Sequence, residues 1–155
     1  MKTFLFSRLS AQKQRTQGFT LIELMIVVAI VAILVVVAYP AYSKQIRKGH
    51  RVDAKSAVLE AAAREEKFFA THNQYSNVAV DLNYAALPFD VISNGQKVYE
   101  LSITVNTAGA PTYLITATPF GDQVNDACHT YQVDNFGTQA NLSSGGAPNS
   151  TTGCW

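Results

Sequence analysis

The first third of the chain is dominated by one long apolar segment. Residues 19–39 read FTLIELMIVVAIVAILVVVAY, which as a helix with ~1.5 Å rise per residue is long enough to cross a ~30 Å hydrocarbon layer. The charged residues before this segment are all basic, namely Lys2, Arg8, Lys13 and Arg15. Because basic residues favour the cytoplasmic side of a membrane, the pattern predicts a membrane-spanning helix with the rest of the chain outside.

The stretch after Pro40 predicts that the helix continues to about Thr71, since it is rich in Ala, Lys, Arg and Glu. Small and apolar side chains recur there at steps of three and four residues, which predicts one face buried against a sheet. That face comprises Ala54, Ala57, Val58, Ala61 and Phe68, and the charged side chains placed away from it are Arg51, Lys55, Glu66 and Lys67. A kink or an easily melted stretch is predicted at Pro40 and Gly49, which weaken the helical backbone.

The second half of the chain carries strand patterns. Residues 97–105 alternate apolar and polar side chains, and residues 111–119 supply the β-branched and aromatic content of an antiparallel partner. Residues 128–133 and 138–140, joined by the turn sequence DNFG, predict two further strands. Residues 72–96 show no clear period and are predicted to be a connecting loop. The pattern predicts an α+β fold, with the long helix packed on a four-stranded antiparallel sheet.

Two positions at the start of the apolar segment do not fit an ordinary membrane anchor. Gly18 ends the basic leader before the apolar run begins, whereas a secretory signal peptide carries its cleavage site beyond the apolar region. Glu23 lies inside the apolar run, where an acid costs roughly 2.5 to 3.5 kcal/mol on insertion scales. We therefore expect Glu23 to be paired or neutralised. The alternatives are a plain single-pass anchor and an acid tolerated near the helix start by the helix dipole.

The sequence GFTLIE, from Gly18 to Glu23, resembles the processing site of type IV pilins and related pseudopilins. The resemblance implies that a prepilin peptidase cleaves between Gly18 and Phe19 and methylates the new amine of Phe19. It also implies that Glu23 is needed for assembly. A cationic amine on one subunit would then pair with Glu23 of its neighbour and offset the burial cost of both charges.

The two cysteines, Cys128 and Cys154, both lie in the carboxyl-terminal part of the chain. Their number suits a disulfide formed in an oxidising compartment. The final stretch, NLSSGGAPNSTTGCW, has almost no apolar content and ends with Cys154 and Trp155. We expect a bridge between Cys128 and Cys154 to tether it.

Several segments of the head, TYLITATP, GDQVNDAC, DNFGT and the terminal Cys-Trp, resemble the minor pilins called PilE-type, whose relatives include ComP-type DNA receptors. The resemblance implies the type IV pilin fold. It divides the chain into a leader at 1–18, a transmembrane and assembly half of the helix at 19–42, and a head at 43–155. Within the head, the sheet and the disulfide-bonded region are expected at 97–155.

The expected function is that of a minor pilin, assembled into a type IV pilus or priming it, for twitching motility, adhesion or DNA uptake. Its expected partners are other pilins through the helix, the prepilin peptidase and the inner-membrane assembly machinery. Its expected location is the bacterial inner membrane with a periplasmic head, and the extracellular pilus after assembly.

Two other functions compete with this one. A DNA-receptor pilin of a competence pilus would need a basic stripe for phosphates, but Lys97 is the only Lys or Arg after Lys67. A pseudopilin of type II secretion shares the leader and the helix. The two cysteines and the Cys-Trp end make the pseudopilin less favoured.

Other chemistry is weakly indicated. His50, His72 and His129 are scattered without metal-ligand spacing, and we predict neither an enzyme nor a cofactor. The loop with Asp122, Asn125 and Asp126 has oxygens suited to calcium, although a plain polar loop is favoured. The basic cluster consists of Lys44, Arg47, Lys48, Arg51 and Lys55, and it suits anionic lipid, acidic neighbours or plain solvation.

Overall fold

The computed structural model describes residues 18–155, so the predicted leader lies outside the described residues except for Gly18. The chain divides into two compact units, one ending at Tyr39 and the other comprising Pro40–Trp155. Helix α1, Leu21–His72, contributes to both units and ends one residue beyond the predicted end. Pro40 lies inside α1. The kink predicted near Pro40 remains a prediction.

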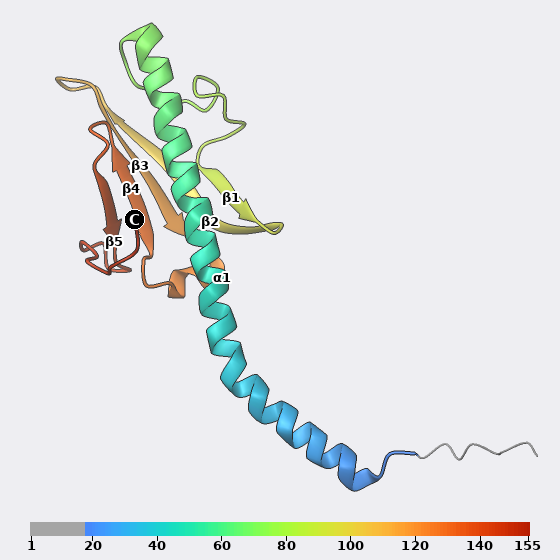
Figure 1. Ribbon diagram of the computed structural model, residues 1–155. Coiled ribbons are helices and arrows are strands. Elements are labelled where there is room, and N and C mark those ends of the chain that lie inside the picture. Colours follow the sequence, from blue (N-terminus) through green and yellow to red (C-terminus); the bar gives the residue numbers. More distant parts are fainter. Residues whose placement is uncertain (1–17) are drawn as a thin grey trace, which may run out of the picture. The chain divides into compact units, whose positions relative to one another are not determined.

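The unit Pro40–Trp155, here called the head, contains a five-stranded antiparallel sheet in the order β1-β2-β3-β4-β5 (Figure 1). Each strand pairs with its neighbour in sequence. The strands are β1 Phe89–Ser93, β2 Gln96–Asn106, β3 Thr112–Pro119, β4 Thr130–Asp134 and β5 Gln139–Leu142, and a short 3-10 helix, η1, spans Gly121–Asn125. The predicted hairpin between the two longest strands is confirmed by the β2 and β3 register, in which Ile103 lies opposite Ile115.

The prediction of four strands was wrong, because β1 lies inside the segment expected to be a loop. Only Val91 of its five residues is buried, so β1 does not show the alternation that marks a half-buried strand. The chain did carry a different signal. Asn94 and Gly95 both have positive φ between β1 and β2, and an Asn-Gly pair is the preferred two-residue hairpin turn.

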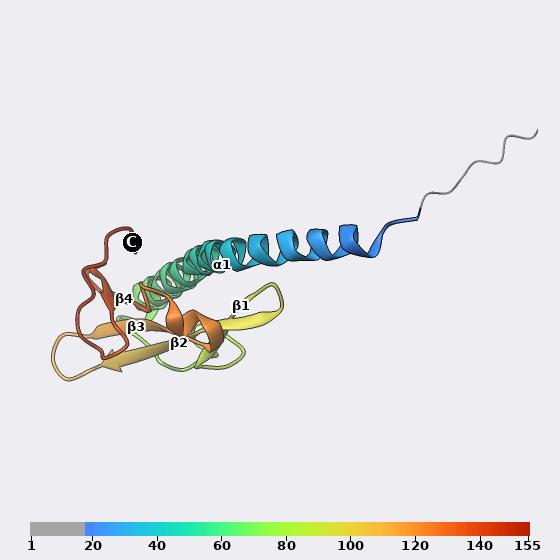
Figure 2. The ribbon, with the colours of Figure 1, turned by 90° about the horizontal axis from the view of Figure 1, so that it is seen from below.

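The core of the head lies between the head part of α1 and one face of the sheet (Figures 1 and 2). From the helix, Ala54, Val58 and Ala61 are fully buried, and Ala57 and Phe68 are partly buried, as predicted. From the sheet and the loops come the larger side chains. These include Leu82, Tyr99, Leu101, Ile115 and Tyr131. Burial of each large apolar side chain is worth roughly 1.5 to 3 kcal/mol, so this layer contributes most of the stabilisation of the head.

The carboxyl-terminal segment is attached to the sheet by a disulfide between Cys128 and Cys154, and both cysteines are buried. Trp155 packs edge-on against Tyr131 and donates its indole N–H to the carbonyl of Ala140 at 3.0 Å. The long helix, the antiparallel sheet and the disulfide-closed carboxyl-terminal region confirm the predicted α+β pilin fold, apart from the number of strands.

The disulfide generates a stability prediction. Its closed loop, with a sequence separation of 26, gives a chain-entropy contribution of about 3.5 kcal/mol. Replacing both cysteines by alanine is expected to lower the unfolding free energy of the full chain by about 3 kcal/mol. Denaturant unfolding followed by the fluorescence of Trp155, the single tryptophan, measures the change. Reductant should destabilise the wild type and leave the double variant unchanged, and a loss below about 1 kcal/mol would contradict the entropic account.

Candidate assembly helix and the contacts that hold the head

The start of α1 is organised by a local cap. Gly18, Phe19 and Thr20 precede the helix, and the Thr20 hydroxyl accepts a hydrogen bond from the backbone N–H of Glu23 at 3.3 Å. A threonine at this position satisfies one of the N–H groups that the first helical turn leaves without an intrahelical acceptor. The Phe19 side chain is 84% exposed. The predicted cleavage site therefore lies outside regular secondary structure, immediately before a capped helix.

Glu23 lies in the first turn of α1, where the helix dipole favours a negative charge. Its side chain is exposed, and within residues 18–155 no ion pair involves it. The predicted cleavage, methylation and assembly roles of Gly18, Phe19 and Glu23 remain predictions.

The apolar side chains that follow Glu23 are also uncovered. The large side chains from Leu24 to Val37 are each more than half exposed. By length and composition, α1 is able to span a membrane. So much exposed apolar surface is unfavourable in water and is expected to be covered by lipid or by other protein.

In the head, two arginines of α1 bind the segment around η1. Arg47 forms an ion pair with Asp122 at 3.0 Å. One helical turn later, Arg51 forms two parallel hydrogen bonds to Asp126, whose side chain is almost completely buried. Asp126 also accepts the backbone N–H of Cys128 at 2.9 Å. The pair raises the pKa of the Arg51 guanidinium, mainly through the hydrogen bond to Asp126.

A third contact lies between these two ion pairs. Gln123 of η1 is buried, and its amide donates to the carbonyl of Arg47 and to the hydroxyl of Tyr99. His50 of α1 is 3.1 Å from the amide oxygen of Gln123. Three residues in or beside η1 thus contact three residues on one face of α1. Most of the polar groups in this region have hydrogen-bond partners.

These contacts correct one prediction and bear on two others. Arg51 does not lie away from the buried face, because it is one turn before Ala54 on the same side of the helix. Two members of the basic cluster, Arg47 and Arg51, meet acidic neighbours from their own chain, which is one of the surroundings that the sequence left open. The oxygens of Asp122 and Asp126 considered for calcium bind arginines instead.

The distal end of the head contains a buried acid that the sequence patterns did not indicate. Glu65 continues the buried face of α1 and is fully buried. One carboxylate oxygen, Oε2, accepts the backbone N–H of Ser76 at 3.1 Å, and Oε1 has no hydrogen-bond partner in the described part of the chain. Beside it, Tyr75 stacks on Phe69 and meets Tyr113 edge-on. Glu65 and Tyr75 together attach the loop after α1 to the core.

Burial raises the pKa of Glu65 to about 7, and the nearby charges of Glu66 and Asp81 act in the same direction. The Ser76 N–H opposes this shift because it favours the charged form. None of the three histidines contacts Glu65 in the described part of the chain. His50 lies beside Gln123, His72 stacks on Phe68, and His129 contacts Thr130.

Comparison with known families agrees with this architecture. Residues 40–132 match the family described as type IV minor pilin ComP, DNA uptake sequence receptor, and residues 13–39 match the prokaryotic N-terminal methylation motif. The chain is a type IV pilin, related to the ComP type. The family resemblance stated from the sequence is therefore confirmed.

Among known pilins, the chain is similar to the type IV major pilin protein PilA of Myxococcus xanthus (strain DK1622), with 37% identity over 78 residues. It is 35% identical over 95 residues to the type IV major pilin protein PilE1 of Neisseria gonorrhoeae. It is 36% identical over 107 residues to the fimbrial protein EcpC of Eikenella corrodens. These matches cover 50%, 59% and 68% of this pilin, and 36%, 56% and 64% of the respective relatives.

The buried acid generates a pH prediction. A carboxyl whose pKa is higher in the folded chain than its ordinary value of 4.5 stabilises the fold while protonated, and this contribution is lost as the pH rises towards about 7. Glu65→Gln, which keeps an acceptor for Ser76 and cannot ionise, should remove this loss. At pH 8 we expect the variant to be more stable than the wild type by up to about 3 kcal/mol.

The measurement is the unfolding free energy of both proteins from pH 4 to pH 8. Asp53→Asn removes a carboxylate earlier on α1 that takes no part in raising the pKa of Glu65. It serves as the control and should follow the wild type. Parallel curves for Glu65→Gln and wild type would show that Glu65 does not change its protonation within this range.

Proposed function

We propose that this pilin is a minor subunit of a type IV pilus, cleaved between Gly18 and Phe19, methylated on Phe19 and incorporated through α1. The observation that supports this function best is the uncovered apolar half of α1 with Glu23 in its first turn. This segment carries the match to the N-terminal methylation motif.

The chemistry of the segment explains how assembly would proceed. Packing the helices of several subunits together would bury the apolar side chains, each worth roughly 1.5 to 3 kcal/mol when fully covered. Cleavage would create a cationic amine on Phe19, two residues before the start of the helix that carries Glu23. Pairing that amine with Glu23 of a neighbour would compensate both buried charges and select one register between subunits.

The proposal includes location and partners. Before assembly the apolar helix lies in the bacterial inner membrane with the head in the periplasm, where the disulfide can form. The prepilin peptidase, the inner-membrane assembly machinery and other pilins are the partners. After assembly the head is displayed on an extracellular pilus that serves motility, adhesion or DNA uptake.

The deciding experiment is quantitative mass spectrometry of pili sheared from cells that express the wild type, Gly18→Leu or Glu23→Ala. The wild type should appear as a trace component whose first peptide begins with methylated Phe19. Gly18→Leu should remain unprocessed in the membrane, and Glu23→Ala should be processed and absent from pili.

Val35→Ala, a change further along the same apolar segment that keeps the cleavage site, the Thr20 cap and the acid, is the control and should still enter pili. A dominant amount in pili would make this chain a major pilin. Unchanged processing of Gly18→Leu would refute the cleavage site. A pseudopilin would be favoured if the wild type is absent from pili and cells that lack the protein have a defect in secretion.

A second candidate function is reception of DNA, favoured by the matched family's description. The distal end of the head also has a hollow of about 350 Å³ between α1 and the following loop, with basic and aromatic groups. Its lining includes Arg64, Lys67, Phe68 and His72. Basic and aromatic side chains suit the phosphates and bases of nucleic acid.

The charges weigh against strong DNA binding. Beyond residue 18 the chain has eight Lys and Arg against eleven Asp and Glu, because four of the twelve basic residues precede that point. Arg64 is held by Glu60 and by the carbonyls of Leu82 and Asn83, and Lys97 is held by Asp90 and Glu100. Among the cations that line the hollow, Lys67 is exposed.

A gel-shift titration with the full chain in detergent tests this candidate. As a DNA receptor, the wild type should bind duplex DNA below about 1 μM, with an affinity that falls steeply as salt increases. Lys67→Glu should then weaken binding by roughly tenfold or more, while Lys44→Glu at the other end of the head helix should not. If binding is absent, or equally weak in both variants, filament assembly remains as the only proposed function.

A further inference from the structure

The side of α1 that faces away from the sheet in the head has a regular exposed stripe. Val52 and Leu59 are 60% and 47% exposed, although both are apolar. The small residues Gly49, Ser56 and Ala63 lie between and beside them, also exposed. No part of the described head covers this stripe, since the core residues lie on the opposite side of the helix.

The spacing of the stripe is that of a coiled-coil seam. Its residues 49, 52, 56, 59 and 63 follow steps of three, four, three and four, which are the a and d positions of a heptad repeat. In the same lettering, the buried residues Ala54, Val58, Ala61 and Glu65 occupy positions f and c. The helix therefore has two separate faces, one for its own sheet and one with the geometry of a partner helix.

The charges beside the seam select the kind of partner. Lys48 and Lys55 occupy the g positions, and Asp53 and Glu60 occupy the e positions five residues further on. In a parallel coiled coil without stagger, each g residue lies beside the e residue of the next heptad on the partner. Two copies of this chain would thus place Lys48 beside Asp53 and Lys55 beside Glu60, twice each across the two-fold axis.

We propose that this seam pairs with the same seam of a second copy, in a parallel and unstaggered homodimer, before the subunit enters a filament. The proposal rests on the proposed membrane location, because two chains anchored in one membrane with the same orientation have parallel helices. The small side chains at 49, 56 and 63 allow the two helices to approach closely. Two heptads form a short seam, so the pair is reversible and available for later assembly.

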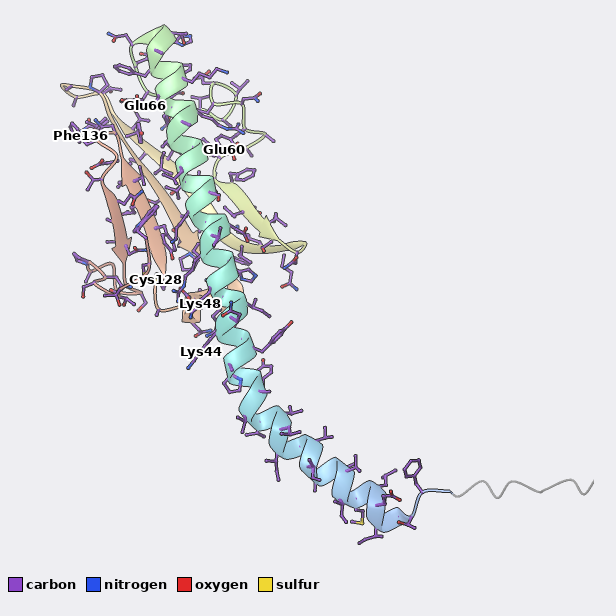
Figure 3. The ribbon with its side chains drawn as sticks, in the orientation of Figure 1. Lys44, Lys48, Glu60, Glu66, Cys128 and Phe136 are labelled. Atoms are coloured by element: carbon purple, nitrogen blue, oxygen red, sulfur yellow. A yellow bond between two sulfur atoms is a disulfide. The ribbon has the colours of Figure 1, made fainter. Side chains whose placement is uncertain are left out.

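Of the two charge pairs, the one between Lys48 and Asp53 gives the sharper test. Neither residue has an ion pair in the described part of its own chain, whereas Glu60 already binds Arg64. Lys48 and Glu60 both project from the head part of α1 (Figure 3). The native cysteines are joined to each other, so a new cysteine has no thiol partner within its own chain.

The experiment is oxidative cross-linking of the full chain in inner membranes of a host that has no other pilins. Leu59→Cys should give a disulfide-linked homodimer, because facing d positions in a parallel pair lie within disulfide reach. Leu114→Cys, at 39% exposure on the outer face of the sheet, is the matched control. We expect roughly fivefold less dimer from it.

Charge exchange then tests the register. In the Leu59→Cys background, Lys48→Glu and Asp53→Lys should each reduce the dimer severalfold, because each places like charges together. The double variant Lys48→Glu with Asp53→Lys restores opposite charges only in the parallel, unstaggered pair. Recovery of the dimer in the double variant is the expected result.

Three results would overturn the proposal: equal cross-linking at Leu59→Cys and Leu114→Cys, no effect of the single charge variants, or no recovery in the double variant. The pilus measurements above are independent of these. Wild-type protein found in pili, together with no specific cross-link in Leu59→Cys, would reject the dimer and leave the proposed function intact. A specific Leu59→Cys dimer, together with absence of the wild type from pili, would support the dimer and refute the proposed pilus role.

Discussion

The packing of α1 on the sheet is the interaction on which the head depends. Ala54, Val58 and Ala61 present a face of small side chains, and the bulk of the core comes from the sheet through Tyr99, Leu101, Ile115 and Tyr131. This division of volume lets a regular helix approach the sheet closely while the larger side chains fill the core. The loop after α1, the 3-10 turn and the disulfide are all fastened to this layer.

Polar contacts determine where the helix begins and ends its contact with the head. At one end, Arg47 and Arg51 bind Asp122 and Asp126, and the buried Asp126 also orients the backbone next to Cys128. At the other end, Glu65 holds the N–H of Ser76 inside the core. Hydrogen bonds to buried charged groups are costly to break when one partner is removed, so these contacts specify one placement of the helix as well as stabilising it.

The same helix has three different surfaces that require different surroundings. Its apolar half needs lipid or other helices, one face of its head half is covered by its own sheet, and the opposite face carries an exposed seam with alternating charges. A filament subunit must exchange its surroundings during assembly. Separating these surfaces along and around one helix allows the head to stay folded while the partners of the other surfaces change.

The sequence by itself was sufficient for the features that depend on local pattern. The long apolar run, the acid at Glu23, the match of residues 13–39 to the N-terminal methylation motif and the alternation in β2 are readable because each is contiguous or strictly periodic. The Asn94-Gly95 turn was readable in principle, and it would have revealed β1. Only the tertiary structure decided which distant charges meet. Arg51 and Asp126 are 75 positions apart, and Glu65 differs from its exposed neighbour Glu66 only through the surface that the folded sheet and loop place over it. Burial and pairing of this kind arise from chain segments that no local pattern connects.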